Sequence, residues 1–265
     1  MKSHDILVAL AVKMNGDWNA IYEFISTKQE FPEEEAKKLL KKVNSKAITC
    51  LDEAYPAYLK EIKKPPFVLF YHGDISLLKD GSKIISVVGA RKNTAYGKKA
   101  TEDLVGQLSK NFIIASGMAI GIDSIAHRTA IRNGGKTIAI LGCGINVCYI
   151  PDCLDIYEEC KKNHLVISEY PDLTPPTIKS FPVRNRIIAG ITRCLLIPEG
   201  KISSGTSITA GLMVENNGEV CCVPTDMYSN SLCNHLISYG AVLVETVQDI
   251  YDAINFRPPT PIFEK

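Results

Sequence analysis

From Lys83 onward the sequence alternates between short apolar runs and longer segments in which apolar residues recur at helical spacing. The runs are rich in β-branched residues and too short for typical helices, so they predict strands. They lie at residues 84–88, 112–115, 137–141, 165–167, 194–197, 220–223 and 242–244, and a separate run at 67–71 precedes them. Apolar strands that alternate with helices indicate a mostly parallel sheet with helices on both faces.

The predicted helices between the strands include residues 100–108, 122–126 and 206–217. We expect Gly218 to end the last of these as a left-handed C′ residue. The first 45 residues also have helical patterns. The predicted fold is therefore α/β, an extended Rossmann-like, doubly wound sheet with a small N-terminal helical segment. The predicted divisions are a helical segment at 1–45, a linker or transition at 46–66, the Rossmann-like domain at 67–256 and a C-terminal tail at 257–265.

Glycine clusters follow four of the predicted strands. They are Gly89-Ala90-Arg91, Ser116-Gly117 with Gly121, Gly142-Cys143-Gly144, and Ser203-Ser204-Gly205-Thr206. The carboxyl ends of parallel strands lie along one edge of a sheet, where ligands bind. Glycine lets backbone N–H groups approach a ligand closely, and helix N-termini favour anions. Four such loops on one edge favour a phosphate-binding site over simple tight turns.

Two familiar nucleotide-binding signatures are incomplete. Gly142-Cys143-Gly144 lacks the third glycine of a dinucleotide fingerprint, because position 147 is Val. The segment Gly134-Gly135-Lys136-Thr137 resembles the end of a P-loop, but position 130 is Ala and the segment leads into a strand. We therefore expect no dinucleotide cofactor and no NTPase site of the Walker type.

A basic segment, Phe181 to Ile188, carries Arg184, Asn185 and Arg186 near a predicted helix start. Arginine suits bidentate phosphate binding. Residues two apart on a helix diverge by about 200°, so the two guanidinium groups need not contact the same partner. The alternative is that the arginines bind internal carboxylates such as Glu169.

Candidate catalytic groups are few. Asp123 and His127 are four residues apart and would lie on one helix face. We interpret them as structural, with Asp123 in the first helical turn and His127 hydrogen-bonded locally. The sequence shows no Ser–His–Asp set and no H-E-x-x-H motif, so it gives no strong catalytic constellation.

The composition bears on nucleic-acid binding, on the cellular location and on metal binding. The 265 residues contain 30 Lys and Arg against 29 Asp and Glu, so a nucleic-acid site has to depend on local charge. The longest N-terminal apolar run, 6–12, is too short for a membrane span and lacks a signal cleavage site, which favours a cytoplasmic protein.

The nine cysteines are expected to be reduced thiols. Four of them, at 143, 148, 153 and 160, leave a metal site as a less favoured alternative, since no C-x2-C pair is present.

Taken in order, these segments resemble the DNA-processing protein A family, also called DprA or Smf. The matching motifs are Tyr55-Pro56, Val87-Val88-Gly89-Ala90-Arg91, Ser116-Gly117-x-Ala119-x-Gly121-Ile122-Asp123, Phe181-Pro182-x-Arg184-Asn185-Arg186, and Ser204-Gly205-Thr206. They extend collinearly over about residues 55–250. Ile120 stands where the family often has Arg, Thr225 where Gly commonly follows the proline, and Cys233 where Gly often precedes Asn234.

The resemblance implies a homodimeric protein that binds and protects single-stranded DNA and helps to load the recombinase RecA during natural transformation. It implies a binding protein and not an enzyme, with no cofactor and no membrane association. The implied DNA- and phosphate-binding residues are Gly89, Arg91, Ser116, Gly117, Gly121, Lys179, Phe181, Arg184, Asn185, Arg186, Ser204, Gly205 and Thr206.

Three other functions remain open at this point. A nucleotide-ligand sensor could use the same pocket for a small phosphorylated signal. A phosphoribohydrolase-like enzyme is disfavoured because Thr209 occupies the position of the glutamate that such a loop requires. A purely structural or partner-binding module is the third alternative.

Overall fold

A computed structural model describes residues 1–256, and the tail predicted at 257–265 lies outside the described residues. The strands are β1 Lys46–Thr49, β2 Val68–Gly73, β3 Ile84–Val87, β4 Ile113–Ser116, β5 Thr137–Leu141, β6 Leu165–Ser168, β7 Cys194–Ile197, β8 Glu219–Cys222 and β9 Val242–Leu243. The α-helices are α1 Ser3–Lys13, α2 Trp18–Ser26, α3 Glu33–Leu40, α4 Ala57–Glu61, α5 Ala95–Leu108, α6 Ile122–Arg132, α7 Leu154–Asn163, α8 Ser180–Gly190, α9 Gly205–Glu215, α10 Leu232–Ser238 and α11 Val247–Ala253. Short 3-10 helices occur at Ile75–Leu78, Gly81–Lys83 and Pro151–Cys153.

The strands form one sheet in the order β1-β2-β6-β5-β4-β3-β7-β8-β9. In this spatial order, the seven neighbouring strands that begin with β6 and end with β9 are parallel to one another. At the β6 end, β2 and then β1 continue the sheet in antiparallel pairs. The mostly parallel, doubly wound sheet predicted from the sequence is confirmed. Successive strands from β3 to β6 run outward in one direction, and β7 returns to the other side of β3. Ligands bind at such a reversal of strand order in open α/β sheets.

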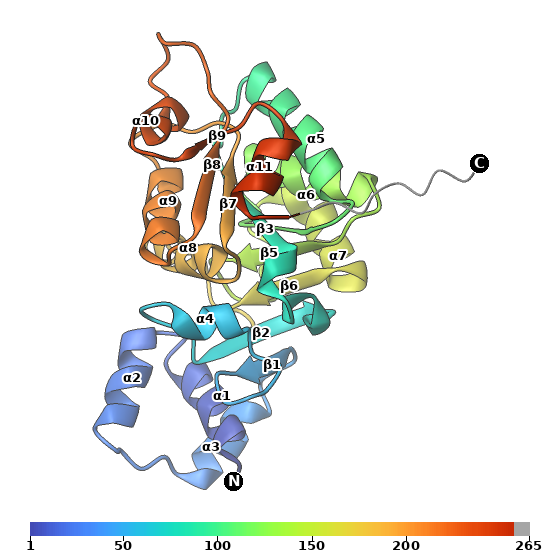
Figure 1. Cartoon of the computed structure of the whole chain (residues 1–265). Helices are drawn as coiled ribbons and strands as arrows, with labels where there is room; N and C mark the ends of the chain where they lie inside the picture. Colours follow the sequence, from blue (N-terminus) through green and yellow to red (C-terminus); the bar gives the residue numbers. More distant parts are fainter. Residues whose placement is uncertain (257–265) are drawn as a thin grey trace, which may run out of the picture.

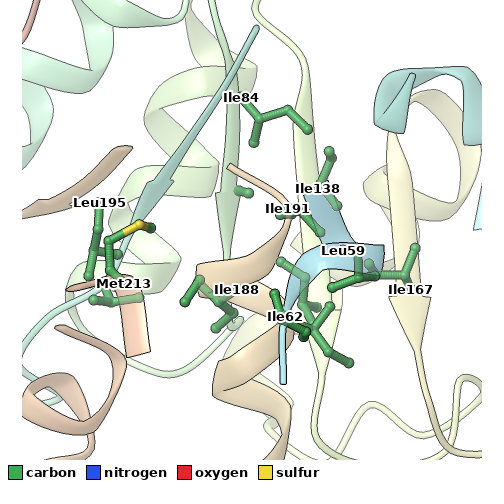
Figure 2. Close-up of a cluster of buried hydrophobic side chains, with 14 of the residues drawn as sticks. Leu59, Ile62, Ile84, Ile138, Ile167, Ile188, Ile191, Leu195 and Met213 are labelled. Atoms are coloured by element: carbon green, nitrogen blue, oxygen red, sulfur yellow. The ribbon is translucent and has the colours of Figure 1, made fainter. Parts of the chain in front are cut away.

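Helices cover both faces of this sheet, and α1–α3 lie beside its β1–β2 end (Figure 1). On one face, side chains from α4, α8 and α9 form a core with the strands, as Figure 2 shows for Leu59, Ile62, Ile188, Ile191 and Met213. On the opposite face, α5, α6 and α11 supply a second core. A third core joins α1, α2 and α7 to β2, β5 and β6. Two neighbouring cysteines of β8 follow the pleat: Cys221 belongs to the second core and Cys222 to the first.

Residues 46–66, expected as a linker or transition, contribute an edge strand and a helix. Lys46–Thr49 forms β1 and pairs with β2. Pro56 precedes α4, whose Leu59 is fully buried in the first core. A four-residue edge strand carries too little alternation to be distinguished from a loop in the sequence.

The end of α9 differs in detail from the prediction. Asn217, not Gly218, adopts the left-handed conformation, with φ of 55°. The Gly218 N–H then donates to the carbonyl of Met213 at 3.0 Å, which completes a Schellman motif. A Cβ at Gly218 would lie 2.1 Å from the Met213 sulfur. Glycine is therefore needed at position 218 for close packing and not for a positive φ.

The cysteine series considered as a metal site is dispersed in the third core. Cys143, Cys153 and Cys160 are fully buried among its apolar side chains, and the Cys143 thiol donates to the Val147 carbonyl. Across residues 1–256, no three His, Cys, Asp or Glu side chains are grouped for metal binding. No helix in this described part of the chain is both long and apolar enough to span a membrane.

Candidate functional site

A cavity of about 560 Å³ opens at the carboxyl edge of the sheet, where the strand order reverses. The loops after β3, β4 and β7 and the first turns of α8 and α9 line it. Three of the four predicted glycine-rich loops therefore contribute to one cavity, whereas Gly142-Cys143-Gly144, after β5, does not line it. Eight of the predicted binding residues line this cavity: Gly89, Arg91, Phe181, Arg184, Asn185, Ser204, Gly205 and Thr206.

The other predicted residues lie close by but do not line the cavity. The Ser116 hydroxyl donates to the Val87 carbonyl at 2.6 Å and so joins the ends of β4 and β3. Gly121 precedes α6 with φ of 87°, where its N-cap position turns the chain into the helix. Lys179 is exposed immediately before α8. Ile120, at the position where the family often has Arg, is 42% exposed.

Arg184 lies at the floor of the cavity and is almost fully buried. Its Nη1 donates to the carbonyls of Gly117, at 2.6 Å, and Ile140. Its Nε donates to the Asn185 side chain at 3.2 Å. A Cβ at Gly117 would lie 2.7 Å from three guanidinium atoms, so glycine is required for this contact. Arg184 is thus a buried cation that connects α8 with the ends of β4 and β5.

Asp123, in the first turn of α6, is the acidic residue at the cavity floor. Its carboxylate accepts hydrogen bonds from the N–H groups of Gly117, at 3.2 Å, and Ala119, at 3.5 Å. Burial raises the pKa of Asp123, and the charge of Arg184 and these backbone donors oppose that shift. Burial likewise lowers the pKa of Arg184, and Asp123 opposes this change. The two buried charges therefore stabilise each other.

Arg186 points away from the cavity and into the protein. Its Nη2 donates to Glu169 at 2.6 Å, its Nε to the Lys64 carbonyl at 2.9 Å, and its Nη1 to the Val183 carbonyl at 3.0 Å. Burial raises the pKa of Glu169, and the charge of Arg186 opposes the shift. The alternative considered for the arginine pair, a bond to Glu169, therefore holds for Arg186. The two arginines diverge on the helix, as their spacing predicted.

The rim of the cavity is basic and aromatic. Arg91 is exposed, and its guanidinium carbon lies 5.9 Å from the centre of the Phe181 ring. On α8, Phe181 also packs against Tyr149, with ring centres 5.2 Å apart. Lys92 and Lys201 are exposed and line the cavity as well. Among the described residues that line it, four cations, Arg91, Lys92, Arg184 and Lys201, accompany one carboxylate.

Sequence reasoning missed Lys92, Lys201 and Tyr149. Both lysines lie in or beside loops that the glycine pattern had identified, so a cation next to a predicted phosphate loop was the available signal. Tyr149 follows β5 in a segment without helical or strand periodicity, and nothing in its immediate sequence indicated a contact with Phe181.

Glu199 fixes the position of the loop that carries Arg91. Its carbonyl accepts from Ala90 N–H at 2.8 Å. Its carboxylate accepts from the N–H of Thr94 at 2.9 Å and from the Thr94 hydroxyl at 3.0 Å. Thr94 is the N-cap of α5. These bonds join the loop after β7 to the loop after β3, its neighbouring strand in the sheet.

Asp123 and His127 do not form an acid–base pair. The His127 Nδ1 is 2.7 Å from the Thr137 hydroxyl, whereas Asp123 binds backbone N–H groups at the cavity floor. The His127 side chain is fully buried. Burial is also the main reason that the pKa of His127 falls to about 3. Asp123 thus lies in the first turn of α6 and His127 is hydrogen-bonded within the protein, the placement that the structural interpretation expected.

Comparisons with known proteins point to one family. The family model described as DNA recombination-mediator protein A matches residues 46–255. A DNA processing protein DprA from Streptococcus pneumoniae is 38% identical over 212 residues, which cover 79% of this chain and 74% of that protein.

Two solved structures are similar over most of their length. The X-ray structure of DNA processing protein A from S. pneumoniae superposes with a TM-score of 0.80 at 33% identity, covering 97% of this chain and 94% of that one. A structure of DNA processing protein A from Helicobacter pylori, reported for its single-stranded DNA binding mode, has a TM-score of 0.73 at 26% identity. That match covers 81% of this chain and 99% of the other.

Proposed function

This chain belongs to the DNA recombination-mediator protein A family, and from that premise we propose that its cavity binds single-stranded DNA. The observation that supports the proposal most directly is the concentration of four cations at one cavity in a chain whose net charge is only +1. The H. pylori relative is described as binding single-stranded DNA. A local basic site of this kind can bind a polyanion without a basic protein overall.

The proposed contacts follow from the chemistry of the rim. Arg91, Lys92 and Lys201 are exposed and would bind backbone phosphates. The loop Ser204–Thr206 at the start of α9 offers N–H groups to a further phosphate. Phe181 offers a ring on which a base can stack. Within the described chain no hydrogen bond engages Nη2 of Arg184, so this atom is available to a ligand at the cavity floor.

The Arg91→Ala variant should weaken binding of a labelled oligo-dT at least about tenfold, because hydrogen bonds to charged groups contribute about 1.5–3 kcal/mol. The slope of log K against log salt should also become shallower by about 0.7, the change expected for one lost phosphate contact. Fluorescence anisotropy titrations with single-stranded and duplex DNA at two salt concentrations would measure both quantities.

Arg132→Ala is the matched control for this prediction. Arg132 is an exposed arginine at the C-terminal end of α6, on the opposite edge of the sheet, where it pairs with Glu102. Its removal should leave the affinity unchanged. Equal binding by wild type and Arg91→Ala would refute the assignment of Arg91 to the site.

A small-nucleotide sensor is the second candidate, because the cavity volume is within the usual range for small ligands. A mononucleotide such as dTMP would then raise the melting temperature in a saturable way, and oligo-dT would bind no more tightly than the monomer. Single-stranded DNA binding predicts instead that affinity increases with oligonucleotide length and decreases with salt.

We further propose that the protein acts in the cytoplasm as a homodimer that helps RecA to assemble on the bound strand. All nine cysteines are free thiols, which suits a reducing compartment. Sedimentation of the purified chain would measure its oligomeric state. RecA filament formation on oligo-dT, with and without this protein, would test the mediator role independently of the binding assay.

A further inference from the structure

A stack of aromatic rings runs from Phe67, just before β2, through Trp18 to Tyr22 on the exposed side of helix α2. The Trp18 ring lies 5.0 Å from the Tyr22 ring at an interplanar angle of 9°, and 5.4 Å from the Phe67 ring at 23°. The surface of Tyr22 is 53% exposed. A large ring that is flat against its neighbour and open to solvent is the geometry on which a nucleic-acid base can stack.

One lysine contacts this stack directly, and two more are exposed close to it in sequence. The Lys64 ammonium lies 5.1 Å from the centre of the Trp18 ring and 2.8 Å from the Asn19 side-chain oxygen. Lys60 and Lys63 are exposed in the same short segment. The nearby Asp17 carboxylate is engaged by two N–H groups at the start of α2. Rings alternating with cations are typical of surfaces that bind single strands.

The stack lies on the same sheet edge as the cavity. In the antiparallel pairing of β2 with β6, Phe70 is opposite Ser168, the last residue of β6. The residues just before β2 therefore lie beyond the carboxyl end of β6, at the edge where the cavity opens. Four strand spacings separate β3 from β2, or about 19 Å.

Hydrogen bonds connect the two places. The Trp18 Nε1 donates to the Pro65 carbonyl at 2.7 Å. Arg186 donates to the carbonyls of Lys64 and Val183, and Val183 is an exposed residue two positions after the cavity residue Phe181. Figure 1 shows α2, α4 and α8 on the same side of the molecule. Arg186, which does not line the cavity, thus holds the aromatic stack against the helix that does.

We propose that a single strand bound in the cavity continues along this edge and stacks a base on Tyr22, beside Lys64. The inference rests on the proposed function, because it extends the same strand beyond the cavity. It assigns to the N-terminal helices a direct contact with DNA.

Trp18 is the single tryptophan of the chain, so its fluorescence reports on this surface alone. Oligo-dT long enough to reach α2 should quench or shift this emission, and an oligonucleotide that only fills the cavity should not. Tyr22→Ala should weaken binding of the long oligonucleotide at least about fivefold, the lower end for stacking one base, and leave the short one unaffected. Tyr22→Phe should bind like wild type, because the ring is retained.

Tyr239→Ala is a matched control, since Tyr239 is an 80% exposed tyrosine at the end of α10, far from α2 along the sheet. An oligo-dT series with one abasic position moved along the strand tests the wild-type protein without mutation. Affinity should fall at two separated positions, one for Phe181 and one for Tyr22.

Unchanged tryptophan emission together with equal long-oligonucleotide affinity of Tyr22→Ala would overturn the inference while leaving the cavity assignment intact. Failure of the proposed function has a different signature: wild type binds no oligonucleotide, or Arg91→Ala binds all lengths as well as wild type does. A Tyr22→Ala variant that loses RecA stimulation but keeps full DNA affinity would also refute the inference and indicate a protein partner at this face.

Discussion

Arg184→Ala is expected to lower the free energy of unfolding by at least about 2 kcal/mol, because each of two buried carbonyls that lose their donor costs about 1–3 kcal/mol. The substitution leaves the buried Asp123 carboxylate without its opposing charge. It also leaves the carbonyls of Gly117 and Ile140 without the Nη1 donor. Urea denaturation followed by circular dichroism would measure the loss.

Two further variants isolate the cause of this destabilisation. Arg91→Ala removes an exposed guanidinium from the same cavity and should change stability by less than about 0.5 kcal/mol. Adding Asp123→Asn to Arg184→Ala should be less destabilising than the sum of the single changes, because the two charges act on each other. A wild-type unfolding curve for Arg184→Ala would contradict this structural role of Arg184.

Arg91 and Arg184 are both among the DNA-binding residues that the family resemblance implies, but their substitutions are not equivalent tests of binding. Because Arg184 is buried and bonded to two strands, its loss combines any effect on binding with an effect on folding. Arg91, on the exposed rim, provides the unambiguous test.

The sheet and its glycine loops could be predicted because their causes are local. Short β-branched runs and helical periodicity mark the elements, and the parallel topology places the carboxyl ends on one edge. The different contacts of the two arginines in the basic segment, residues 181–188, could not be predicted in the same way. Arg184 and Arg186 have similar neighbours in sequence, but their partners, Gly117 and Glu169, are distant along the chain. Only the packing of α8 against the sheet decides which arginine faces the cavity.

The short elements near the β2 edge were missed for a related reason. β1 and α4 have four and five residues, and tertiary contacts stabilise them more than their own sequence does. Lys64 belongs to this region, next to α4, and its relation to Arg186 arises only when β2 pairs with β6. For this reason the sequence motifs did not indicate the aromatic surface of α2, which we propose as an extension of the DNA site.

His127 should make the protein lose stability as the pH falls below about 6.5. The Thr137 hydroxyl donates to the Ile114 carbonyl at 2.6 Å, so its oxygen accepts from His127 Nδ1–H. The neutral ring then carries its lone pair on Nε2, which is buried and has no hydrogen-bond partner among the described residues. Protonation would place an unpaired charge there, which explains why burial lowers the pKa from 6.5 to about 3.

The direction in which stability changes with pH follows from proton binding to His127. Between pH 6.5 and 3 the unfolded histidine is protonated and the folded one is not, so stability increases with pH in this range. The stabilisation that the neutral His127 contributes to the folded state is complete above pH 6.5. It is lost as the pH falls toward 3, by about 1.4 kcal/mol per pH unit. Between pH 7 and 5 the wild type should therefore lose about 2 kcal/mol more than His127→Gln, whose amide can still donate to Thr137.

Urea unfolding at several pH values would measure both curves. His164, whose pKa burial also lowers, titrates in the same direction, and its charge contributes to the lowered pKa of His127. Both curves are therefore measured in a His164→Gln background, where this coupling is absent. Parallel curves for wild type and His127→Gln would show that the buried ring accepts a proton as readily as the unfolded one. If protonation of the unpaired Nε2 destabilises the folded state, the free energies of unfolding of the two proteins should converge as the pH falls. The variant lacks the group whose protonation drives unfolding.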